Sequence, residues 1–427
     1  MSDGSRIPGF YKLSIEERRR RVSEAAGVDV EALTAALTGG LDPRAADKVV
    51  ENVLGVYALP FGVALNVQVN GVDRLVPMVV EEPSVVAAAS NAARMVRASG
   101  GFHATTTADL MISQVQLYDV PDPEAARERL LAHQAELLSL ADAAAPGLRS
   151  RGGGPRDLEV RDLGDGYLVL HLLVDCQDAM GANLVNGMAE AVGPRAQAIA
   201  GGQLGLRILS NLCDQRRVKV RCEVHPRDLE LRRGDQVVSG DEVLDGIVQA
   251  SRFAERDPYR AATHNKGIMN GVDAVVLATG NDFRAVEAGA HAYAARSGRY
   301  APLAVWRREG ERLLGELELP LALGIVGGTL RVHPLARLAL ELTRVTSAAE
   351  LAHVAASAGL ASNLAALRAL ATEGIQRGHM SLHARSVATA AGAEGNEVEL
   401  VAQRIAEAGH INLEQAELAL AALRRAP

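Results

Sequence analysis

One stretch near the start of the chain constrains the fold more than any other feature. Residues 63–80, VALNVQVNGVDRLVPMVV, alternate apolar and polar side chains around Asn70-Gly71, a dipeptide that favours a tight turn between two strands. Residues 81–101 follow directly and run from a proline suited to a first helical turn to a Gly-Gly stop. This segment is apolar or small on nearly all sides, so we expect a helix buried at the centre of a domain.

Length and composition set the scale of that domain. The 427 residues exceed what one hydrophobic core usually organises, so we expect two or three structural units. Hydrophobic residues make up 48% of the chain but aromatic residues only 3%, which predicts a core of Ala, Val and Leu with closely packed helices. The net charge of −7 argues against a general nucleic-acid binder.

The cysteines and the apolar segments indicate the compartment. Cys176, Cys213 and Cys222 are odd in number and lack a CxxC spacing, so the sequence signals neither a disulfide framework nor a structural zinc site. The N-terminus has no apolar signal core, and no segment offers about 18 uninterrupted apolar residues. We therefore expect a cytoplasmic protein without a membrane anchor.

The order of the expected elements indicates an α+β fold with an insertion. Residues 14–37 are expected to form a helical arm, and residues 107–212 a compact unit of strand, helix, Gly-rich loop, two strands, helix and strand. This unit contains two βαβ-like halves. The predicted divisions are a large domain in two parts, an inserted small domain and a C-terminal helical flap: 1–106, 107–212, 213–374 and 375–427.

Carboxylates stand at two places where chemistry is possible. Glu81 and Glu82 precede the apolar helix; acids there often only complement the helix dipole, but a partly desolvated carboxyl group can donate a proton near neutral pH. Asp282 follows a glycine turn and precedes another expected helix, where an aspartate is most often an N-cap. It gains a chemical role if it meets Lys266, because it would then hold that lysine charged.

Residues 257–271, DPYRAATHNKGIMNG, gather several polar groups. Arg260, His264, Lys266 and Asn270 fall within eleven positions. Hydride attack on a carbonyl turns its oxygen into an oxyanion, and a fixed positive charge beside that oxygen stabilises it. Lys266 could supply this charge; the alternative is a solvated lysine without a chemical role.

A histidine pair lies near the C-terminus. His379 and His383 are four residues apart, the spacing of zinc proteases, but Met380 stands where their glutamate base would be. A single histidine on a mobile terminal unit instead suits a proton donor to a leaving thiolate, since imidazole titrates near neutral pH. The sequence therefore favours His379 as an acid over a metal site.

A small-residue loop leads into a helix at residues 178–183, DAMGAN. Such a loop lets a cofactor phosphate approach the backbone N–H groups of the helix N-terminus. The chain shows no GxGxxG fingerprint here, so a Rossmann site is not expected. The alternative for this motif alone is a tight turn between a strand and a helix.

Together and in this order, these motifs resemble the 3-hydroxy-3-methylglutaryl-CoA (HMG-CoA) reductase family, and the HNKG form is similar to its class II, soluble bacterial branch. The resembling segments cover nearly the whole chain: ENVLG (51–55), VPMVVEEPSVVAA (76–88), DAMGAN (178–183), HNKGIMNG (264–271), ATGND (278–282) and RGHM (377–380). The resemblance implies a large domain around a central helix, an inserted ferredoxin-like cofactor domain and a C-terminal flap.

The resemblance also implies roles for individual residues. The implied catalytic set is Glu82, Lys266, Asp282 and His379. The implied contacts to the hydroxymethylglutaryl group are Ser84, Arg260 and Asn270, with Arg260 pairing its free carboxylate. The positions that match the surroundings of the nicotinamide cofactor are Asp178, Met180, Gly181, Asn183, Asn186 and Asn211.

The implied reaction is the four-electron interconversion of HMG-CoA with mevalonate and CoA, which uses two NADH or NADPH and no metal. The implied assembly is a homodimer or larger oligomer with the active site between subunits. The cofactor choice stays open, because Ala143–Ala145 stand where NADH-preferring relatives carry an acid and Arg149 and Arg151 could attract a 2′-phosphate. The alternatives are another acyl-CoA or aldehyde oxidoreductase, a catalytically silent homologue, and a metal-dependent hydrolase that uses His379 and His383.

Overall fold

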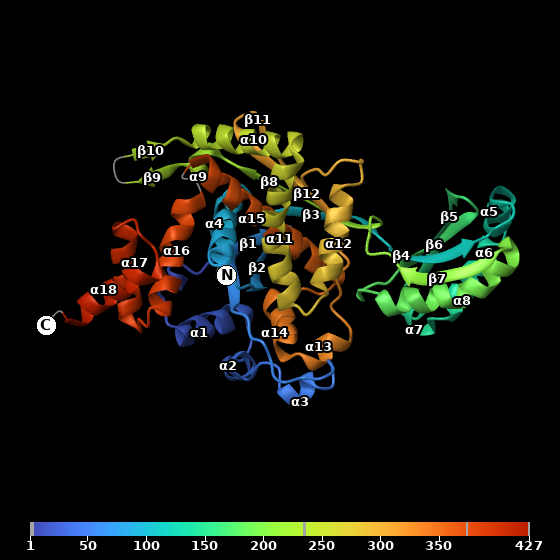
Figure 1. The fold of residues 1–427 in the computed structure, drawn as a ribbon, viewed down its shortest axis with the longest axis horizontal. Helices are drawn as coiled ribbons and strands as arrows, with labels where there is room; N and C mark the ends of the chain where they lie inside the picture. Colours follow the sequence, from blue (N-terminus) through green and yellow to red (C-terminus); the bar gives the residue numbers. More distant parts are fainter. Residues whose placement is uncertain (1–3, 234–235, 373–374, 426–427) are drawn as a thin grey trace.

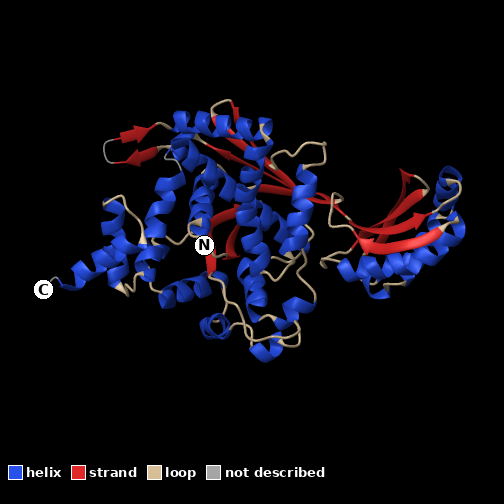
Figure 2. Ribbon diagram, in the orientation of Figure 1, coloured by secondary structure: helices blue, strands red, loops and turns tan. Residues whose placement is uncertain are grey.

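The computed structural model describes residues 4–233, 236–372 and 375–425. Figure 1 shows a large central body, a lobe formed by the middle of the chain at the right, and a small helical unit at the C-terminal end on the left. Helices dominate the central body, whereas the lobe contains one sheet with helices packed against it (Figure 2). The expected α+β class is confirmed.

The N-terminal arm consists of short helices rather than the single helix expected over residues 14–37. Ser14 caps the first long helix by accepting a hydrogen bond from the Glu17 amide at 3.2 Å. Gly27 ends that helix in the left-handed region, with φ 69°, and Asp29 caps the next one. The elements are a 3₁₀ turn, Phe10–Lys12, and helices α1 (Ile15–Ala26), α2 (Val30–Gly39) and α3 (Pro43–Ala46).

The predicted hairpin is confirmed, with strands β1 (Phe61–Val69) and β2 (Val72–Val79) pairing antiparallel. Asn70 and Gly71 both adopt positive φ angles, of 52° and 78°, as a two-residue hairpin turn requires. Strand β2 therefore ends just before Glu82 and sets the position of that carboxylate.

The central body also contains a four-stranded antiparallel sheet in the order β11-β12-β8-β3. The only tryptophan of the chain, Trp306, is fully buried, and its indole N–H donates to Asn363 Oδ1 at 2.7 Å. The strands of the body are β3 (His103–Asp109), β8 (Arg216–Val224), β9 (Leu231–Arg233), β10 (Gln236–Val238), β11 (Ala304–Glu309) and β12 (Arg312–Pro320). Its helices are α4 (Val85–Arg97), α9 (Pro226–Leu229), α10 (Gly240–Arg256), α11 (Pro258–Ala278), α12 (Phe283–Ala294), α13 (Gly328–Val332), α14 (Pro334–Thr343) and α15 (Ala348–Thr372).

The most enclosed helix is α15, not the expected helix of residues 81–101. Every residue of α15 from 354 to 364 is buried, whereas α4 exposes Ala87, Asn91 and Arg94 along one side. The expectation for α4 was wrong because alanine and serine fit equally well on a buried and an exposed face. Among the described residues, α15 is also the one helix long and apolar enough to span a bilayer, but 67% of its most apolar window is buried inside the protein.

Glycines allow α11 and α15 to pack backbone against backbone. A Cβ atom on Gly271 would lie 2.4 Å from the carbonyl oxygen of Ala358, and one on Gly359 would lie 2.7 Å from the side chain of Val272. Only glycine permits contacts this close. The expectation of closely packed helices is confirmed here, and this contact fixes the axis of α11, which carries Lys266 and Asn270.

The lobe is a βαββαβ unit whose sheet has the order β5-β6-β4-β7, all antiparallel. This is the ferredoxin-like arrangement that the family resemblance implied. Its elements are β4 (Met111–Tyr118), α5 (Pro123–Ala132), α6 (Gln134–Ala143), α7 (Pro146–Arg149), β5 (Gly154–Gly164), β6 (Tyr167–Asp175), α8 (Ala182–Ala200) and β7 (Gln203–Leu209). The lobe has a hydrophobic core separate from that of the central body.

The C-terminal unit consists of α16 (Ile375–Ala390), α17 (Asn396–Glu407) and α18 (Leu413–Arg425). Its small core contains Ala388, Val401, Ile405 and Leu420. Figure 1 shows the unit projecting from the side of the body opposite the lobe.

Candidate active site

Glu82, Lys266 and Asn270 meet at the junction of β2, α4 and α11. The Lys266 ammonium group lies 2.6 Å from Glu82 Oε2, and the Asn270 amide donates to the same oxygen at 3.2 Å. Lys266 and Asn270 are four residues apart on α11, so they point to the same side of the helix. Because the Lys266 side chain is 63% exposed, a ligand can reach the ammonium group while Glu82 holds it.

Ser84 carries two signs of a ligand contact beside this cluster. It is a non-glycine residue in the left-handed region, with φ 76°, which costs energy that the surroundings must supply. Its hydroxyl group is buried, finds no hydrogen-bond partner among the described residues, and does not cap α4 although Ser84 occupies the N-cap position. A strained residue with an unsatisfied buried hydroxyl fits a group that binds a substrate.

Arg260 is a half-buried cation near the start of α11. Its backbone amide donates to Asp257, but no carboxylate among the described residues pairs with its guanidinium group. Burial lowers the pKa of Arg260, because removal from water disfavours the charged form. A desolvated guanidinium group without a partner is suited to bind an anionic ligand.

Asp282 does not join Lys266 within one chain. Its carboxylate caps α12 by accepting from the Arg284 and Ala285 amides at 3.1 and 3.3 Å, and it forms an ion pair with Arg284 at 3.2 Å. From Lys266 to the end of α11 at residue 278, the helix rises about 18 Å at 1.5 Å per residue. Asp282 follows four residues after that end. The described part of the chain shows no hydrogen bond or ion pair between the two residues.

The loop of residues 177–181 lies where the lobe meets the body. Gly181 has φ 102°, and a Cβ atom there would lie 2.4 Å from Cys176 Sγ, so only glycine fits. Gly181 is also the N-cap of α8 and offers no side-chain cap, which leaves backbone N–H groups of the first turn available to an anion. This local structure fits a phosphate-bearing ligand.

The other predicted cofactor residues surround this loop. Asp178 Oδ1 accepts from the Ala348 amide at 2.8 Å, and Asn186 Oδ1 accepts from the Leu209 amide at 2.8 Å. Asn183 is exposed at the start of α8. Met180 and Asn211 lie in the two segments that enter α8 and leave β7. The six residues therefore group around one end of the lobe, although two of them also have structural partners.

The histidines differ in environment. His379 lies in α16, but its side chain is outside the described residues; His383 is exposed. His264 is 1% exposed, and its Nε2 lies 3.0 Å from the carbonyl oxygen of Ala304. Burial and the nearby charge of Arg260 lower the pKa of His264 to about 4, so this ring is neutral and structural. Among the described residues, no group of three His, Cys, Asp or Glu side chains could hold a metal ion.

Comparisons with known proteins identify the family to which the chain belongs. A family model for hydroxymethylglutaryl-coenzyme A reductase matches residues 14–384. The 3-hydroxy-3-methylglutaryl-coenzyme A reductase of Archaeoglobus fulgidus is 50% identical over 425 residues, which covers 98% of this chain and 95% of that protein. The chain belongs to the HMG-CoA reductase family.

Solved structures place it in the class II branch of the HMG-CoA reductases. A Streptococcus pneumoniae HMG-CoA reductase matches with a TM-score of 0.82 and 43% identity, covering 97% of this chain and 99% of the other. A second structure, of the class II enzyme from the same species bound to NADPH in open conformations, matches with a TM-score of 0.81 and 44% identity over 86% of this chain and 99% of that one. The chain is therefore an oxidoreductase of this family.

Two polar clusters of this family member were missed by the sequence analysis. Arg216 is buried between the lobe and the body, and no motif drew attention to it. On α12, His291 Nε2 lies 2.6 Å from Glu287 Oε2, and His291 Nδ1 lies 2.6 Å from the Tyr300 hydroxyl group. Burial raises the pKa of Asp273, which also shares a hydrogen bond with Glu287. The Glu-His spacing of four residues on one helix could have revealed this second cluster.

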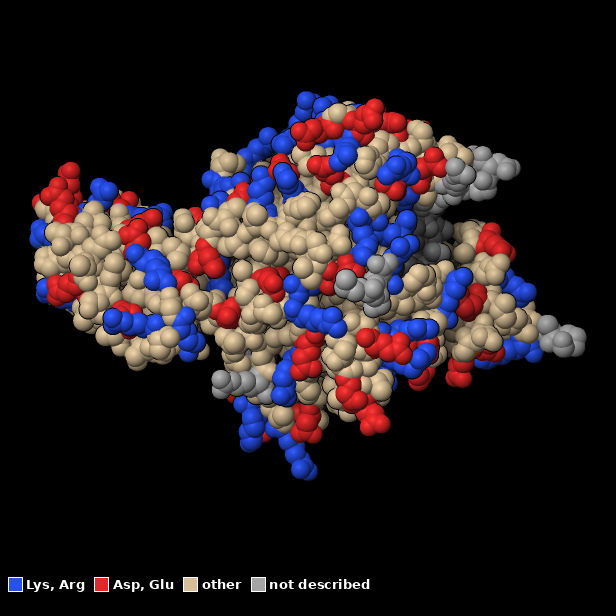
Figure 3. All heavy atoms as spheres, turned by 180° about the vertical axis from the view of Figure 1, so that it is seen from behind, with Lys and Arg blue, Asp and Glu red and all other residues tan. Residues whose placement is uncertain are grey.

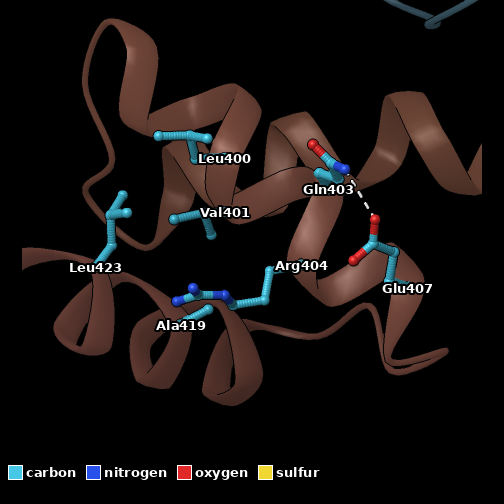
Figure 4. A pocket seen from close by; sticks show the side chains of 7 residues that line it. All are labelled: Leu400, Val401, Gln403, Arg404, Glu407, Ala419 and Leu423. Atoms are coloured by element: carbon cyan, nitrogen blue, oxygen red, sulfur yellow. Dashed lines mark hydrogen bonds between the residues drawn. The ribbon is translucent and has the colours of Figure 1, made fainter. Parts of the chain in front are cut away.

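A cavity of about 210 Å³ lies in the C-terminal unit, away from Lys266. Figure 4 shows Leu400, Val401 and Leu423 around it, with a hydrogen bond of 2.8 Å between Gln403 and Glu407 at one side. The cavity has no acid, lysine and hydroxyl arrangement like that at Glu82, so we assign no chemistry to it.

Proposed function

We propose that this family member interconverts HMG-CoA with mevalonate and CoA at a site that contains Glu82, Lys266, Asp282 and His379. The observation that carries the proposal is the Lys266–Glu82 pair, 2.6 Å apart, next to the unpartnered hydroxyl group of Ser84. A thioester carbonyl placed against this ammonium group would gain a stabilised oxyanion when hydride attacks it.

The reaction consists of two reductions, and the nicotinamide cofactor supplies one hydride to each. In the first, Lys266 stabilises the hemithioacetal oxygen; when the C–S bond breaks, His379 protonates the CoA thiolate, and the substrate becomes an aldehyde. In the second, Glu82 delivers a proton to the alkoxide as the aldehyde becomes an alcohol. Overall, HMG-CoA, two reduced cofactors and two protons give mevalonate, CoA and two oxidised cofactors.

Arg260 and Asn270 complete the substrate side of the proposed site. The guanidinium group of Arg260, which pairs with no carboxylate of the described residues, would bind the free carboxylate of the hydroxymethylglutaryl group, and Ser84 would donate to one of its oxygens. A substrate without that carboxylate would leave Arg260 unpaired. This argues against a different acyl-CoA or aldehyde substrate.

The lobe, residues 107–212, is the proposed cofactor domain. The 177–181 loop and the uncapped first turn of α8 fit a phosphate group. The S. pneumoniae relative was solved with NADPH, which supports a nicotinamide cofactor here. Arg149, at the end of α7, is 75% exposed and pairs with Asp142 of α6 at 2.9 Å, so a basic and an acidic group lie side by side here. We propose that both NADH and NADPH are accepted.

Asp282 would reach Lys266 from a second copy of the chain. Within one chain, α11 separates the two residues. Asp282 instead lies near the 177–181 loop: the side chain of its neighbour Asn281 donates to Gly324 O and accepts from the Gly324 amide, and the next amide, of Ile325, donates to Asp178 O at 2.9 Å. One subunit would thus supply Asp282 and the cofactor, and its partner would supply Lys266 and Glu82. We propose a homodimer or larger assembly on this basis. The three free cysteines support our proposal that it works in the reducing cytoplasm.

The exposed apolar side chains of residues 49–57 support an interface between copies. Leu54 and Tyr57 are 105% and 88% exposed, and Val50 is 57% exposed. Apolar side chains gathered in this way usually mark a contact surface. On the face seen in Figure 3, basic and acidic side chains are interspersed and uncharged side chains cover much of the junction between lobe and body.

The assay follows cofactor absorbance with HMG-CoA and either reduced cofactor. The reductase function fails if neither cofactor is consumed. The shared site is tested by mixing the inactive variants Lys266→Ala and Asp282→Ala after subunit exchange. If each site draws one residue from each subunit, random pairing restores about a quarter of the wild-type rate, because half of the dimers are mixed and each has one intact site. No recovery in a mixture shown to contain mixed dimers would contradict the shared site.

A further inference from the structure

Arg216 occupies the junction through which the chain returns from the lobe to the body. It is the first residue of β8 and is 5% exposed. Its Nε lies 3.3 Å from Asp109, the last residue of β3, where the chain leaves the body for the lobe. A buried arginine needs partners for all its N–H groups, so its remaining contacts show what it holds.

Those contacts go to backbone carbonyl groups on both sides of the junction. One terminal nitrogen donates to Ala179 O and Met180 O, both at 3.0 Å. The other donates to Gln177 O at 3.2 Å and to Leu323 O at 3.0 Å. Three of these four carbonyls belong to the 177–181 loop, and the fourth belongs to the body. The rigid fork of the guanidinium group therefore joins the loop to the body.

Other bonds place the same loop against the body. The Ala348 amide, at the start of α15, donates to Asp178 Oδ1 at 2.8 Å, and the Ile325 amide donates to Asp178 O at 2.9 Å. Ala179 and Val326 also form a parallel bridge. Although the loop belongs to the lobe in sequence, its hydrogen bonds go mainly to the body. The 177–181 loop thus attaches the lobe to the body at a third place, in addition to the two connecting segments.

We propose that Arg216 is a positioning residue that holds the 177–181 loop, and with it the N-terminus of α8, at a fixed place relative to Asp282. The inference rests on the proposed function in one respect, the identity of the ligand at the loop. Arg216 does not touch the ligand. Its loss would free the loop and weaken cofactor binding, and it would leave the distant Arg260 and Ser84 contacts to the substrate unchanged.

The test compares Arg216→Lys with Arg221→Gln, an exposed arginine on the same strand. Lysine keeps the charge beside Asp109 but cannot donate to four carbonyls. We expect Arg216→Lys to raise the KM for the reduced cofactor about tenfold, because small displacements of positioned groups have effects of this size, and to change the KM for HMG-CoA less than about twofold. Arg221→Gln should resemble the wild type in both constants.

A second measurement does not depend on turnover. Amide hydrogen exchange should become faster at residues 177–182 in Arg216→Lys, with no change around Glu82 and Lys266. If Arg216→Lys does not fold, Asp109→Asn gives a milder test. It removes the ion pair that orients Arg216 and so loosens the guanidinium group without removing it, and we expect a change in cofactor KM in the same direction but smaller, about threefold.

The outcomes separate this inference from the proposed function. If kcat falls while both KM values and loop exchange stay at the wild-type level, Arg216 is only structural and the inference is wrong. If both KM values rise equally, Arg216 does not act on the cofactor side selectively, which also overturns it. If the wild type does not reduce HMG-CoA but the loop exchange responds as expected, the reductase function fails and the positioning role stands.

Discussion

The two ends of α11 differ in how their polar groups are satisfied. Near Lys266, within the part of the chain that the structure describes, the Ser84 hydroxyl group has no hydrogen-bond partner and the Arg260 guanidinium group pairs with no carboxylate. Near Asp282, by contrast, Arg216 makes four carbonyl bonds and an ion pair, and Asn281 bonds both backbone groups of Gly324. Unpaired buried groups cost stability and indicate a place for a ligand, whereas fully paired groups indicate a rigid support. We therefore call the Lys266 end of α11 the binding end, because it is suited to a ligand, and the Asp282 end the holding end, because it supports the 177–181 loop.

The largest effect should come from Lys266. Lys266→Ala removes the charge that stabilises the oxyanion, so kcat should fall about a thousandfold with little change in the KM for the cofactor. Steady-state rates with saturating HMG-CoA measure this, and Lys48→Ala, an exposed lysine at the surface, is the control. A Lys266→Ala enzyme with more than about a tenth of the wild-type kcat would remove the lysine from the mechanism.

His264 should make stability fall in acid. The folded chain keeps this ring neutral down to about pH 4, while the unfolded chain takes up a proton near pH 6.5, so the unfolded state binds more protons in this window. The free energy of unfolding should therefore drop by up to about 3 kcal/mol as the pH falls from 6.5 to 4. Urea titrations at several pH values should show a shallower dependence in His264→Gln; an identical slope would show that this ring does not titrate as described.

Arg260 tests the binding end directly. Arg260→Gln should raise the KM for HMG-CoA about 10- to 100-fold, because a hydrogen-bonded charge pair is worth about 1.5–3 kcal/mol, and should leave the cofactor KM unchanged. This is the reverse of the pattern expected for Arg216→Lys. If the two variants give the same pattern, the distinction between a binding end and a holding end is wrong.

Ser84 gives the smallest effect and separates strain from chemistry. Ser84→Gly and Ser84→Ala both lose the hydroxyl group and should weaken HMG-CoA binding alike. Only glycine relieves the left-handed backbone, so Ser84→Gly should be about 1 kcal/mol more stable than Ser84→Ala. Thermal unfolding of the two variants measures the difference, and equal stabilities would mean that residue 84 stores no strain.

Local signals in the sequence predicted much of the fold but not the relative burial of the helices. The Asn70-Gly71 turn and the order of elements in the lobe were readable because turn residues and periodicity act locally. The break after Gly27 was missed although Gly27 and Asp29 are ordinary stop and start residues, because the apolar pattern continues across it. The choice of α15 over α4 as the central helix depends on tertiary packing, which an alanine-rich pattern does not encode.

The sequence likewise predicted only part of the site. The family resemblance brought together Glu82 and Lys266, 184 positions apart, and the structure shows them in contact. The place of Asp282 at the far end of α11 follows from helix length, which the motif order does not reveal. Arg216 was not predicted because its partners are backbone carbonyls, and these leave no trace in residue types.

The glycine contact between α11 and α15 has a consequence for engineering. Because Gly271 and Gly359 let the two backbones touch, the close approach of α15 helps to fix the helix that carries Lys266 to Glu82. An alanine at position 359 would push the helices apart, and we expect it to shift the ammonium group of Lys266 from a buried position outside the site. Libraries that vary only the lining of the site would never sample this remote adjustment.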